Sequence, residues 1–413
     1  MGVAIAKPRE PPTIHVNNNL DKNELSGASS NAIQIVPSTT KVSVAIRDLR
    51  MQVAISSRID QTLQNEKIED LTRVKILLLG GADAGKSTIL KQMRILHMNG
   101  FDADEMHSFQ KYLRYNLFQI FHEVAIGVEE CVTDIANIEK NKIYRFSEGI
   151  SWIIGIDEEQ EIEFLLDFIK LDCVRSFIEL YPNYSTLPDN ASYYIPKLPA
   201  LLSANYKPTA EDILHLRIPT TSVNEINFAF SNRTIRLIDV GGQRTYRKKW
   251  IHYFDGVAAV LFVVSMAAYD QSLDEVDKML KPVLHKDIFP VEAVKPKPDN
   301  RLRDSAQLFG DMLRSKYLAT AAFILFLNKK DLFWKKLPIH PLGKYVNAYK
   351  GTNNDEAAEF LKEYFLKRKS KNDKDRPIYS HFTCATDTEN VEFVFKAACE
   401  IVLQKNLNKS GIQ

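Results

Sequence analysis

The sequence has few cysteines, no long apolar run and almost no net charge, and each shortage excludes a class of protein. Its four cysteines are Cys131, Cys173, Cys384 and Cys399. They form no CxxC pair, so we expect neither a structural zinc site nor a disulfide framework. The longest apolar stretch, residues 256–269, is too short for a membrane-spanning helix, which needs about 20 apolar residues. A net charge of +2 gives no overall field that would attract nucleic acid. We therefore expect an intracellular, soluble protein that does not bind nucleic acid.

The composition changes along the chain in a way that predicts four parts. Residues 1–40, rich in Pro, Asn and Ser, are typical of a disordered tail. Residues 41–72 carry apolar side chains at roughly helical spacing, which predicts an amphipathic helix that either binds a partner or packs on its own domain. Residues 73–100 and 209–413 contain short apolar segments between helical stretches, whereas residues 101–208 have helical periodicity and no clear strand. This predicts a parallel sheet covered by helices on both faces, interrupted by an all-helical insertion.

Four short segments are predicted as buried strands, and one polar segment as an exposed loop. The strands are "RVKILLLG" (73–80), "TIRLIDV" (234–240), "AAVLFVVSM" (258–266) and "AAFILFLN" (321–328). The loop is the Pro-rich stretch "PVEAVKPKPDNRLRD" at residues 290–304, and a helix is expected to start near Arg301.

A glycine-rich loop follows the first predicted strand. Gly80, four intervening residues, Gly85, Lys86 and Ser87 match the phosphate-binding pattern. Backbone N–H groups of such a loop converge on a β-phosphate at the N-terminus of the next helix. Lys86 would bridge the β- and γ-phosphates, and Ser87 would hold magnesium. The alternative is a plain glycine turn between a strand and a helix.

A second motif, "DVGGQ" at residues 239–243, ends another predicted strand. Asp239 can hold magnesium through a water molecule, and the N–H of Gly242 can reach a γ-phosphate. The amide of Gln243 could orient an attacking water. Alone this pattern is usually a strand-end turn, but following a phosphate-binding loop it indicates a nucleotide site.

The third motif, "NKKD" at residues 328–331, indicates guanine rather than adenine. Asp331 can accept hydrogen bonds from the N1 and N2 donors of guanine, a pair that adenine lacks. Further along, the backbone N–H of Ala385, in "TCAT", could read guanine O6. Without the other motifs, these segments would be polar loops after strands.

Two further candidate site residues follow the predicted all-helical insertion. Arg217, in "LHLRIPTTS", could neutralise charge on a transferring phosphoryl group, and Thr220 could ligate magnesium. By itself Arg217 is more often a surface arginine. Its place between two predicted domains favours the catalytic interpretation.

Together these motifs resemble the heterotrimeric G-protein α subunits over about residues 45–413. The resemblance rests on "KILLLGGADAGKSTILKQMRILH", "DNASYY", "LRIPTTS", "RLIDVGGQRTYRKKWIHYFDGVAAVLFVVSMAAYD", "FILFLNKKDLF", "FTCATDTENVEFVF" and "KNL", in that order. It implies a Ras-like GTPase domain with a mostly parallel six-stranded sheet, an inserted all-α domain and an N-terminal helix. It also implies GTP or GDP and Mg²⁺ as ligands. The implied partners are a βγ dimer that contacts the N-terminal helix, a seven-transmembrane receptor bound through the C-terminus, and an effector of unknown identity.

The resemblance implies roles in the nucleotide site for individual residues. Matching residue types stand at Lys86, Ser87, Arg217, Thr220, Asp239, Gly242, Gln243, Asn328, Lys329, Asp331 and Ala385. The implied nucleotide contacts also include Gly80, Asp83, Ala84, Gly85, Thr88 and Leu214. Ser87 and Thr220 would bind Mg²⁺ directly, and Gln243 and Arg217 would be catalytic. Residues near 217–222 and 240–250 would be ordered by the γ-phosphate and released on hydrolysis.

The phosphate-binding loop departs from the family's Gly-Ala-Gly-Glu-Ser-Gly-Lys-Ser. Ala82 stands in place of a glycine beside the γ-phosphate, and Asp83 replaces a glutamate that reaches toward the catalytic arginine. Ala84 lacks a hydroxyl. Because small misplacements at a reacting centre cost much rate, we hypothesise that this chain binds GTP but hydrolyses it slowly. The alternative is that a small loop shift accommodates Ala82.

The two chain ends bear on membrane attachment and receptor choice. Gly2 is available for myristoylation after removal of Met1, although Ala6 stands where the motif prefers Ser or Thr. No cysteine lies near the N-terminus for palmitoylation, and one acyl chain anchors weakly. We therefore expect peripheral attachment to the cytoplasmic face of the plasma membrane, mainly through the βγ partner. The C-terminal "SGIQ" assigns no receptor class.

Three functions remain open at this point. The first is a GTP-hydrolysing signalling switch, which we favour. The second is a GTP-binding module with little catalysis that sequesters βγ or receptor. The third, a phosphate-loop ATPase or kinase of another family, conflicts with the "NKKD" motif.

Overall fold

The computed structural model describes residues 50–65, 73–132, 158–180, 187–203, 206–231, 233–271, 300–351, 353–370 and 376–409. The chain divides into two units, residues 1–67 and residues 68–413. The first unit contains a helix over residues 50–65, within the predicted amphipathic segment 41–72. Its exposed apolar side chains are those of Met51, Val53, Ile55, Ile59 and Leu63. Their contact with a βγ dimer stays a prediction, and the predicted tail 1–40 lies outside the described residues.

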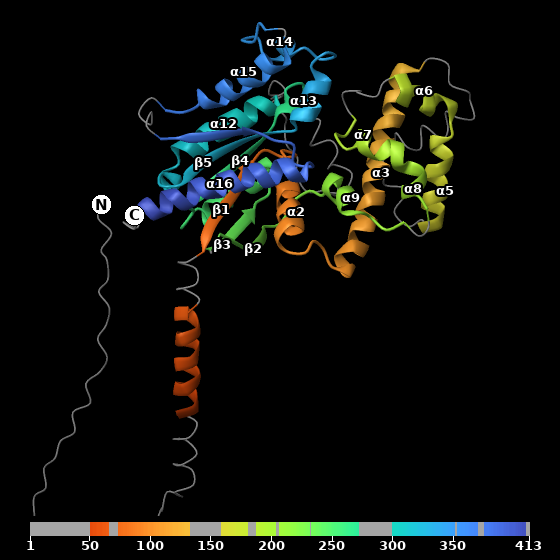
Figure 1. Ribbon diagram of the computed structural model, residues 1–413. Coiled ribbons are helices and arrows are strands. Elements are labelled where there is room, and N and C mark those ends of the chain that lie inside the picture. Colours follow the sequence, from red (N-terminus) through yellow and green to blue (C-terminus); the bar gives the residue numbers. More distant parts are fainter. Residues whose placement is uncertain are drawn as a thin grey trace, which may run out of the picture. The chain divides into compact units, whose positions relative to one another are not determined.

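A six-stranded sheet forms the centre of the second unit (Figure 1). Its strands are β1 (Val74–Gly80), β2 (Asn224–Phe230), β3 (Arg233–Asp239), β4 (Ala259–Ser265), β5 (Ala322–Asn328) and β6 (Ile378–Phe382). The spatial order is β2-β3-β1-β4-β5-β6. Neighbouring strands are parallel except β2, which runs antiparallel to β3 at one edge. The predicted mostly parallel six-stranded sheet is therefore confirmed.

Helices cover both faces of this sheet, as the apolar strands require. The covering helices are α2 (Lys86–His97) and α16 (Thr388–Lys409) on one face, and α12 (Arg301–Arg314), α13 (Lys330–Lys336) and α15 (Asn354–Leu366) on the other. Because side chains alternate along a strand, Leu77 and Leu79 pack toward α12, whereas Ile76 and Leu78 pack toward α2. Shorter elements are α10 (Arg244–Arg247), α14 (Leu342–Tyr345), η3 (Trp250–Tyr253), η4 (Met266–Ala268) and η6 (Lys316–Leu318).

The segment between α2 and β2 forms a helical domain with its own core. Its elements are α3 (Ala103–Cys131), α5 (Glu158–Ile169), α6 (Asp172–Leu180), α7 (Ala191–Tyr194), η2 (Ile195–Lys197), α8 (Leu198–Leu201) and α9 (Ala210–His215). The long α3 begins with a capping box, in which the Asp102 carboxylate accepts from the N–H of Glu105 at 2.8 Å. Buried side chains such as Phe121, Phe168 and Phe177 join α3 to α5 and α6, and Figure 1 shows these helices gathered around α3. The predicted all-α insertion is confirmed.

The predicted exposed loop at residues 290–304 overlaps α12, whose start near Arg301 is confirmed, and the predicted exposure is wrong at this end. Asn300 caps α12 by accepting hydrogen bonds from the N–H groups of Leu302 and Arg303, so residues 301–304 are the first turn of a helix. Arg301 is also buried. The polar composition suggested exposure, but the side chains of Arg301 and Asp304 turn inward to form ion pairs. Residues 290–299 lie outside the described part of the chain.

In the described part of the chain, no helix combines the length and the apolarity that crossing a bilayer requires.

Candidate nucleotide-binding site

A cavity of about 400 Å³ lies where the loops after β1 and β5 meet the helical domain. Its volume suits a small organic ligand, and the carboxyl ends of parallel strands are where α/β sheets bind ligands. The predicted residues that line it are Asp83, Ala84, Gly85, Lys86, Ser87, Thr88, Leu214, Arg217, Thr220, Gly242, Gln243, Asn328, Lys329, Asp331 and Ala385. Gly80 and Asp239 are not part of the lining; they end β1 and β3. The structure therefore brings all the predicted residues except Gly80 and Asp239 together around one cavity.

The loop between β1 and α2 has the geometry of a phosphate cradle. Gly85 precedes α2 with a φ of 100°, and a Cβ there would lie 2.2 Å from Nδ2 of Asn328, so this position requires glycine. Lys86, only 5% exposed, donates from Nζ to the carbonyl of Gly81 at 2.8 Å and to that of Gly80 at 3.2 Å. Burial lowers the pKa of Lys86. A buried ammonium at a helix N-terminus is suited to an anionic ligand.

Three side-chain oxygens converge beside Lys86 and suit a magnesium ion. The Ser87 hydroxyl donates to Oδ2 of Asp239 at 2.5 Å and lies 2.6 Å from the hydroxyl of Thr220. The Asp239 side chain is fully buried, and its Oδ1 has no hydrogen-bond partner within the described residues. Burial raises the pKa of Asp239, as expected for a carboxylate that a cation would stabilise. Hydroxyl and carboxylate oxygens are the donors that Mg²⁺ prefers, so these residues fit the ion.

Asn328 links the two segments that are predicted to contact guanine, residues 328–331 and the loop that contains Ala385. Its Nδ2 donates to the carbonyl of Ala84 at 2.8 Å, and its Oδ1 accepts from the backbone N–H of Ala385 at 2.9 Å. Asn328 therefore joins the phosphate loop to the loop after β6. The N–H of Ala385, predicted to meet guanine O6, is already bonded to Asn328. The carboxylate of Asp331 lines the cavity and accepts from the thiol of Cys384 at 3.2 Å.

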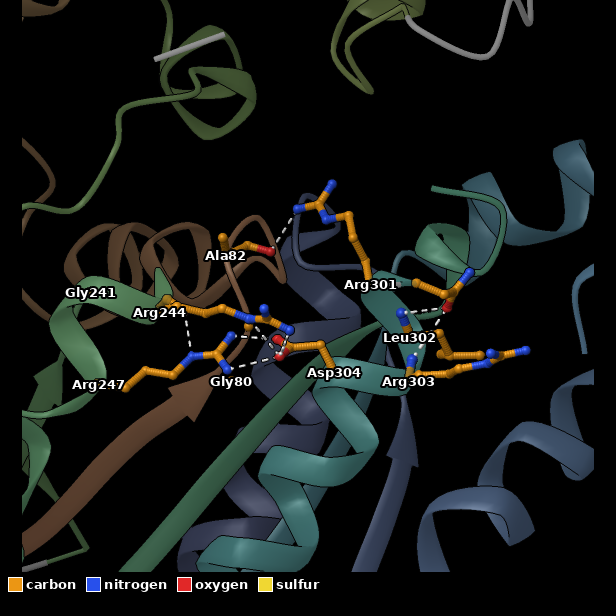
Figure 2. Close-up of polar contacts among 12 residues, drawn as sticks. Gly80, Ala82, Gly241, Arg244, Arg247, Arg301, Leu302, Arg303 and Asp304 are labelled. Atoms are coloured by element: carbon orange, nitrogen blue, oxygen red, sulfur yellow. Dashed lines mark hydrogen bonds and ion pairs between the residues drawn. The ribbon is translucent and has the colours of Figure 1, made fainter. Parts of the chain in front are cut away.

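Arg217 is paired with the phosphate loop. Its guanidinium lies 2.8 Å from the carboxylate of Asp83, so the shorter Asp83 still reaches the arginine. Arg301 lies 3.6 Å from the same carboxylate. It also donates to the carbonyl of Ala82 at 2.8 Å, a bond drawn in Figure 2. Burial alone would raise the pKa of the Asp83 carboxyl, but the surrounding cations, Arg217 first, hold it well below its usual value.

Gln243 lines the cavity and directly precedes the short helix α10. The segment around it is held by α12. Asp304 binds Arg244 at 2.9 Å and Arg247 at 2.6 Å, and both arginines point toward it in Figure 2. Arg247 also donates to the carbonyl of Gly242 at 3.1 Å. The backbone next to Gln243 is thus attached to the same helix that contacts Ala82.

Apart from Leu214 of α9, sequence reasoning missed the part of the lining that the helical domain supplies. These residues are Gln119, Asp189, Asn190, Ser192, Tyr193 and His215. Asp189 bonds Lys329 at 2.6 Å and so joins the two domains across the cavity. The "DNASYY" segment contributed to the resemblance, but no site residue was assigned within it. Arg301 was also missed, because it belonged to the segment predicted as a loop.

Comparison with known proteins agrees with this geometry. The family described as "G-protein alpha subunit" matches residues 53–402. The guanine nucleotide-binding protein alpha-5 subunit of Caenorhabditis elegans is 33% identical over 371 residues, covering 86% of this chain and 96% of that protein. The alpha-7 subunit of the same organism is 35% identical, covering 89% and 98%. The G(o) subunit alpha of Locusta migratoria is 33% identical, covering 88% and 97%. The chain therefore belongs to the G-protein α-subunit family of guanine nucleotide-binding signalling proteins.

Proposed function

We propose that this chain is a signalling switch that binds GTP, hydrolyses it to GDP and exchanges the product for new GTP. The observation that carries the proposal is the placement of Arg217 and Gln243 on the same cavity as Lys86 and Ser87. Binding groups and candidate catalytic groups thus face one ligand site.

The binding step uses charges and oxygens already in place. The ammonium of Lys86 would neutralise the β- and γ-phosphates, and backbone N–H groups at the start of α2 would bind phosphate oxygens. Ser87 and Thr220 would hold Mg²⁺ directly and Asp239 through water; when bound, the ion would offset negative charge on the phosphates. Asp331 would accept from guanine N1 and N2, which favours GTP over ATP.

The hydrolytic step would use the two remaining side chains. The amide of Gln243 would orient the attacking water, and the guanidinium of Arg217 would stabilise charge on the transferring phosphoryl group, an arrangement for which Gα proteins are themselves the standard example. Arg217 is held by Asp83 at 2.8 Å. The guanidinium therefore has to share its donors between this carboxylate and the phosphoryl oxygens.

Ala82 supports the hypothesis of slow hydrolysis. It lines the cavity, and its carbonyl is bonded to Arg301 at 2.8 Å, which limits the loop shift that would accommodate its Cβ. If hydrolysis is slow enough, the second function applies, in which the GTP-bound chain acts by occupying βγ or receptor.

Single-turnover hydrolysis of GTP with Mg²⁺ tests the proposal. We expect measurable conversion to GDP by the wild type, a faster rate in Ala82→Gly, and competition of binding by guanine but not adenine nucleotides. An unchanged rate in Ala82→Gly would remove Ala82 as the cause of slow hydrolysis. Failure of guanine nucleotides to compete better than adenine nucleotides would contradict the proposed ligand.

The proposed partners follow from family membership. They are a βγ dimer at the N-terminal helix, a seven-transmembrane receptor at the C-terminus and an effector that the sequence does not name. We propose peripheral association with the cytoplasmic face of the plasma membrane, mainly through βγ. Retention of the chain on membranes in cells that lack βγ would count against this route.

A further inference from the structure

One side chain of the helical domain holds the backbone of Arg217 on both sides. Asn116 lies on α3 and is 1% exposed. Its Oδ1 accepts from the backbone N–H of Arg217 at 2.8 Å, and its Nδ2 donates to the carbonyl of Arg217 at 3.0 Å. A single amide therefore satisfies both backbone polar groups of the candidate catalytic arginine, 101 residues further along the chain.

The remaining hydrogen-bonding capacity of Asn116 is also used. Its Nδ2 donates to the carbonyl of Tyr112 at 2.9 Å, and its Oδ1 accepts from Nδ2 of Asn190 at 2.8 Å. Asn190 also donates to the carbonyl of His215 at 3.1 Å. An asparagine side chain offers two donors and one oxygen with two lone pairs. With all of them bonded, the amide has one favourable orientation, and the backbone it holds is correspondingly restrained.

The same backbone segment is also held by α2, the helix that follows the phosphate loop. Lys91 of α2 donates from Nζ to the carbonyls of Ile213 and Leu216, each at 2.9 Å. The side chain of Arg217 is itself paired with Asp83. Residues 213–217 are thus bonded both to α2 of the α/β domain and to α3 of the helical domain, and Asn116 makes the contacts to the backbone of Arg217 itself.

From this arrangement we infer that Asn116 is a positioning residue for Arg217: it fixes the arginine backbone so that the guanidinium reaches the phosphoryl group. The inference rests on the proposed hydrolysis. A displacement of about 1 Å at a reacting centre can cost about a hundredfold in rate. Asn116 does not itself line the cavity, so its effect reaches the reaction through Arg217.

A double-mutant cycle on the full chain separates positioning from stability. We expect Asn116→Ala to slow single-turnover GTP hydrolysis about tenfold to a hundredfold, with little change in GTP affinity. In an Arg217→Ala background the same change should have no further effect on the rate, although it should still lower the unfolding temperature. Phe121→Leu, a buried change on the same helix, is the matched control and should lower stability without slowing hydrolysis.

The inference is overturned if Asn116→Ala leaves the rate unchanged, slows it equally in both backgrounds, or acts no more strongly than Phe121→Leu. A second measurement does not need hydrolysis. The ¹⁵N resonance of the Arg217 guanidinium, assigned with Arg217→Lys, should shift in Asn116→Ala and not in Phe121→Leu. An unchanged resonance refutes the positioning role even if the chain hydrolyses no GTP, whereas absent hydrolysis with a shifted resonance refutes the proposed function alone.

Discussion

The two walls of the nucleotide cavity hold their polar groups in different ways. The wall built by the sheet carries charged side chains in the segments that follow strands: Lys86 begins α2 after the glycine-rich loop, and Lys329 directly follows β5. On the side of the helical domain, neutral amides hold distant backbone groups: Asn190 in the cavity wall bonds the carbonyl of His215, and Asn116 behind that wall bonds the backbone of Arg217. We therefore expect changes in the sheet wall to act mainly on binding. Changes in the helical wall should act mainly on hydrolysis and nucleotide release.

The strongest test of the sheet wall is Lys86→Ala. Removing a buried ammonium aimed at the phosphates should raise the Kd for GTP about a hundredfold or more, which corresponds to about 2.7 kcal/mol. Titration with a fluorescent GTP analogue measures this. Lys75→Ala is the control, because Lys75 lies on β1 outside the cavity and bonds the carbonyl of Asp255. Equal loss of affinity in both variants would contradict a specific phosphate contact.

Arg217 lies between the two walls, and Arg217→Ala should separate hydrolysis from binding. We expect the single-turnover rate to fall about a hundredfold, the usual cost of removing one group that stabilises transition-state charge. The Kd for GTP should change much less, because Lys86 and the loop N–H groups remain. A parallel loss of affinity and rate would show that Arg217 binds the ground state instead.

The ion pair between Asp189 and Lys329 predicts a smaller effect, on the rate of GDP release. Asp189 and Lys329 lie 2.6 Å apart and are mostly buried. Burial alone would raise the pKa of Asp189, but Lys329 outweighs it and lowers the value. Asp189→Asn should therefore speed GDP dissociation about tenfold, measured by displacement of labelled GDP, since breaking a buried pair costs more than breaking an exposed one. Asp311→Asn, in an exposed pair with Arg314, should leave dissociation unchanged.

The smallest expected effect concerns acid stability of the helical domain. Burial alone would raise the pKa of Asp212, but hydrogen bonds from Tyr206, Thr209 and Tyr193 outweigh it and lower the value. Because the folded pKa lies below the unfolded value of about 3.9, these bonds stabilise the fold above that pH, and their contribution is lost as the pH falls. Between about pH 5 and pH 3, the wild type should lose more stability than Asp212→Asn. Thermal unfolding at several pH values measures this, and equal slopes would contradict it.

The sheet and its motifs could be predicted because their signals are local. An apolar run followed by glycine, lysine and serine encodes a strand, a tight turn and a helix N-terminus within 14 residues of chain, from Val74 to Ser87. The same reasoning anticipated a helix starting near Arg301 but missed that Arg301 and Asp304 turn inward. Their polar segment reads as a surface loop, but partners on other elements make the burial of these charges favourable. The slow-hydrolysis hypothesis based on Ala82 stays a prediction.

The sequence by itself determined which chemical groups are present and the order of strand, loop and helix around them. Backbone sterics and side-chain alternation act over a few residues, so they can be read from neighbours in the chain. Only the tertiary structure decided that Asp83 reaches Arg217 and that Asn116 holds the Arg217 backbone. These contacts join segments more than 100 residues apart, and they depend on how the helical domain packs beside the sheet. That packing is a collective result of many buried side chains, and no single motif encodes it.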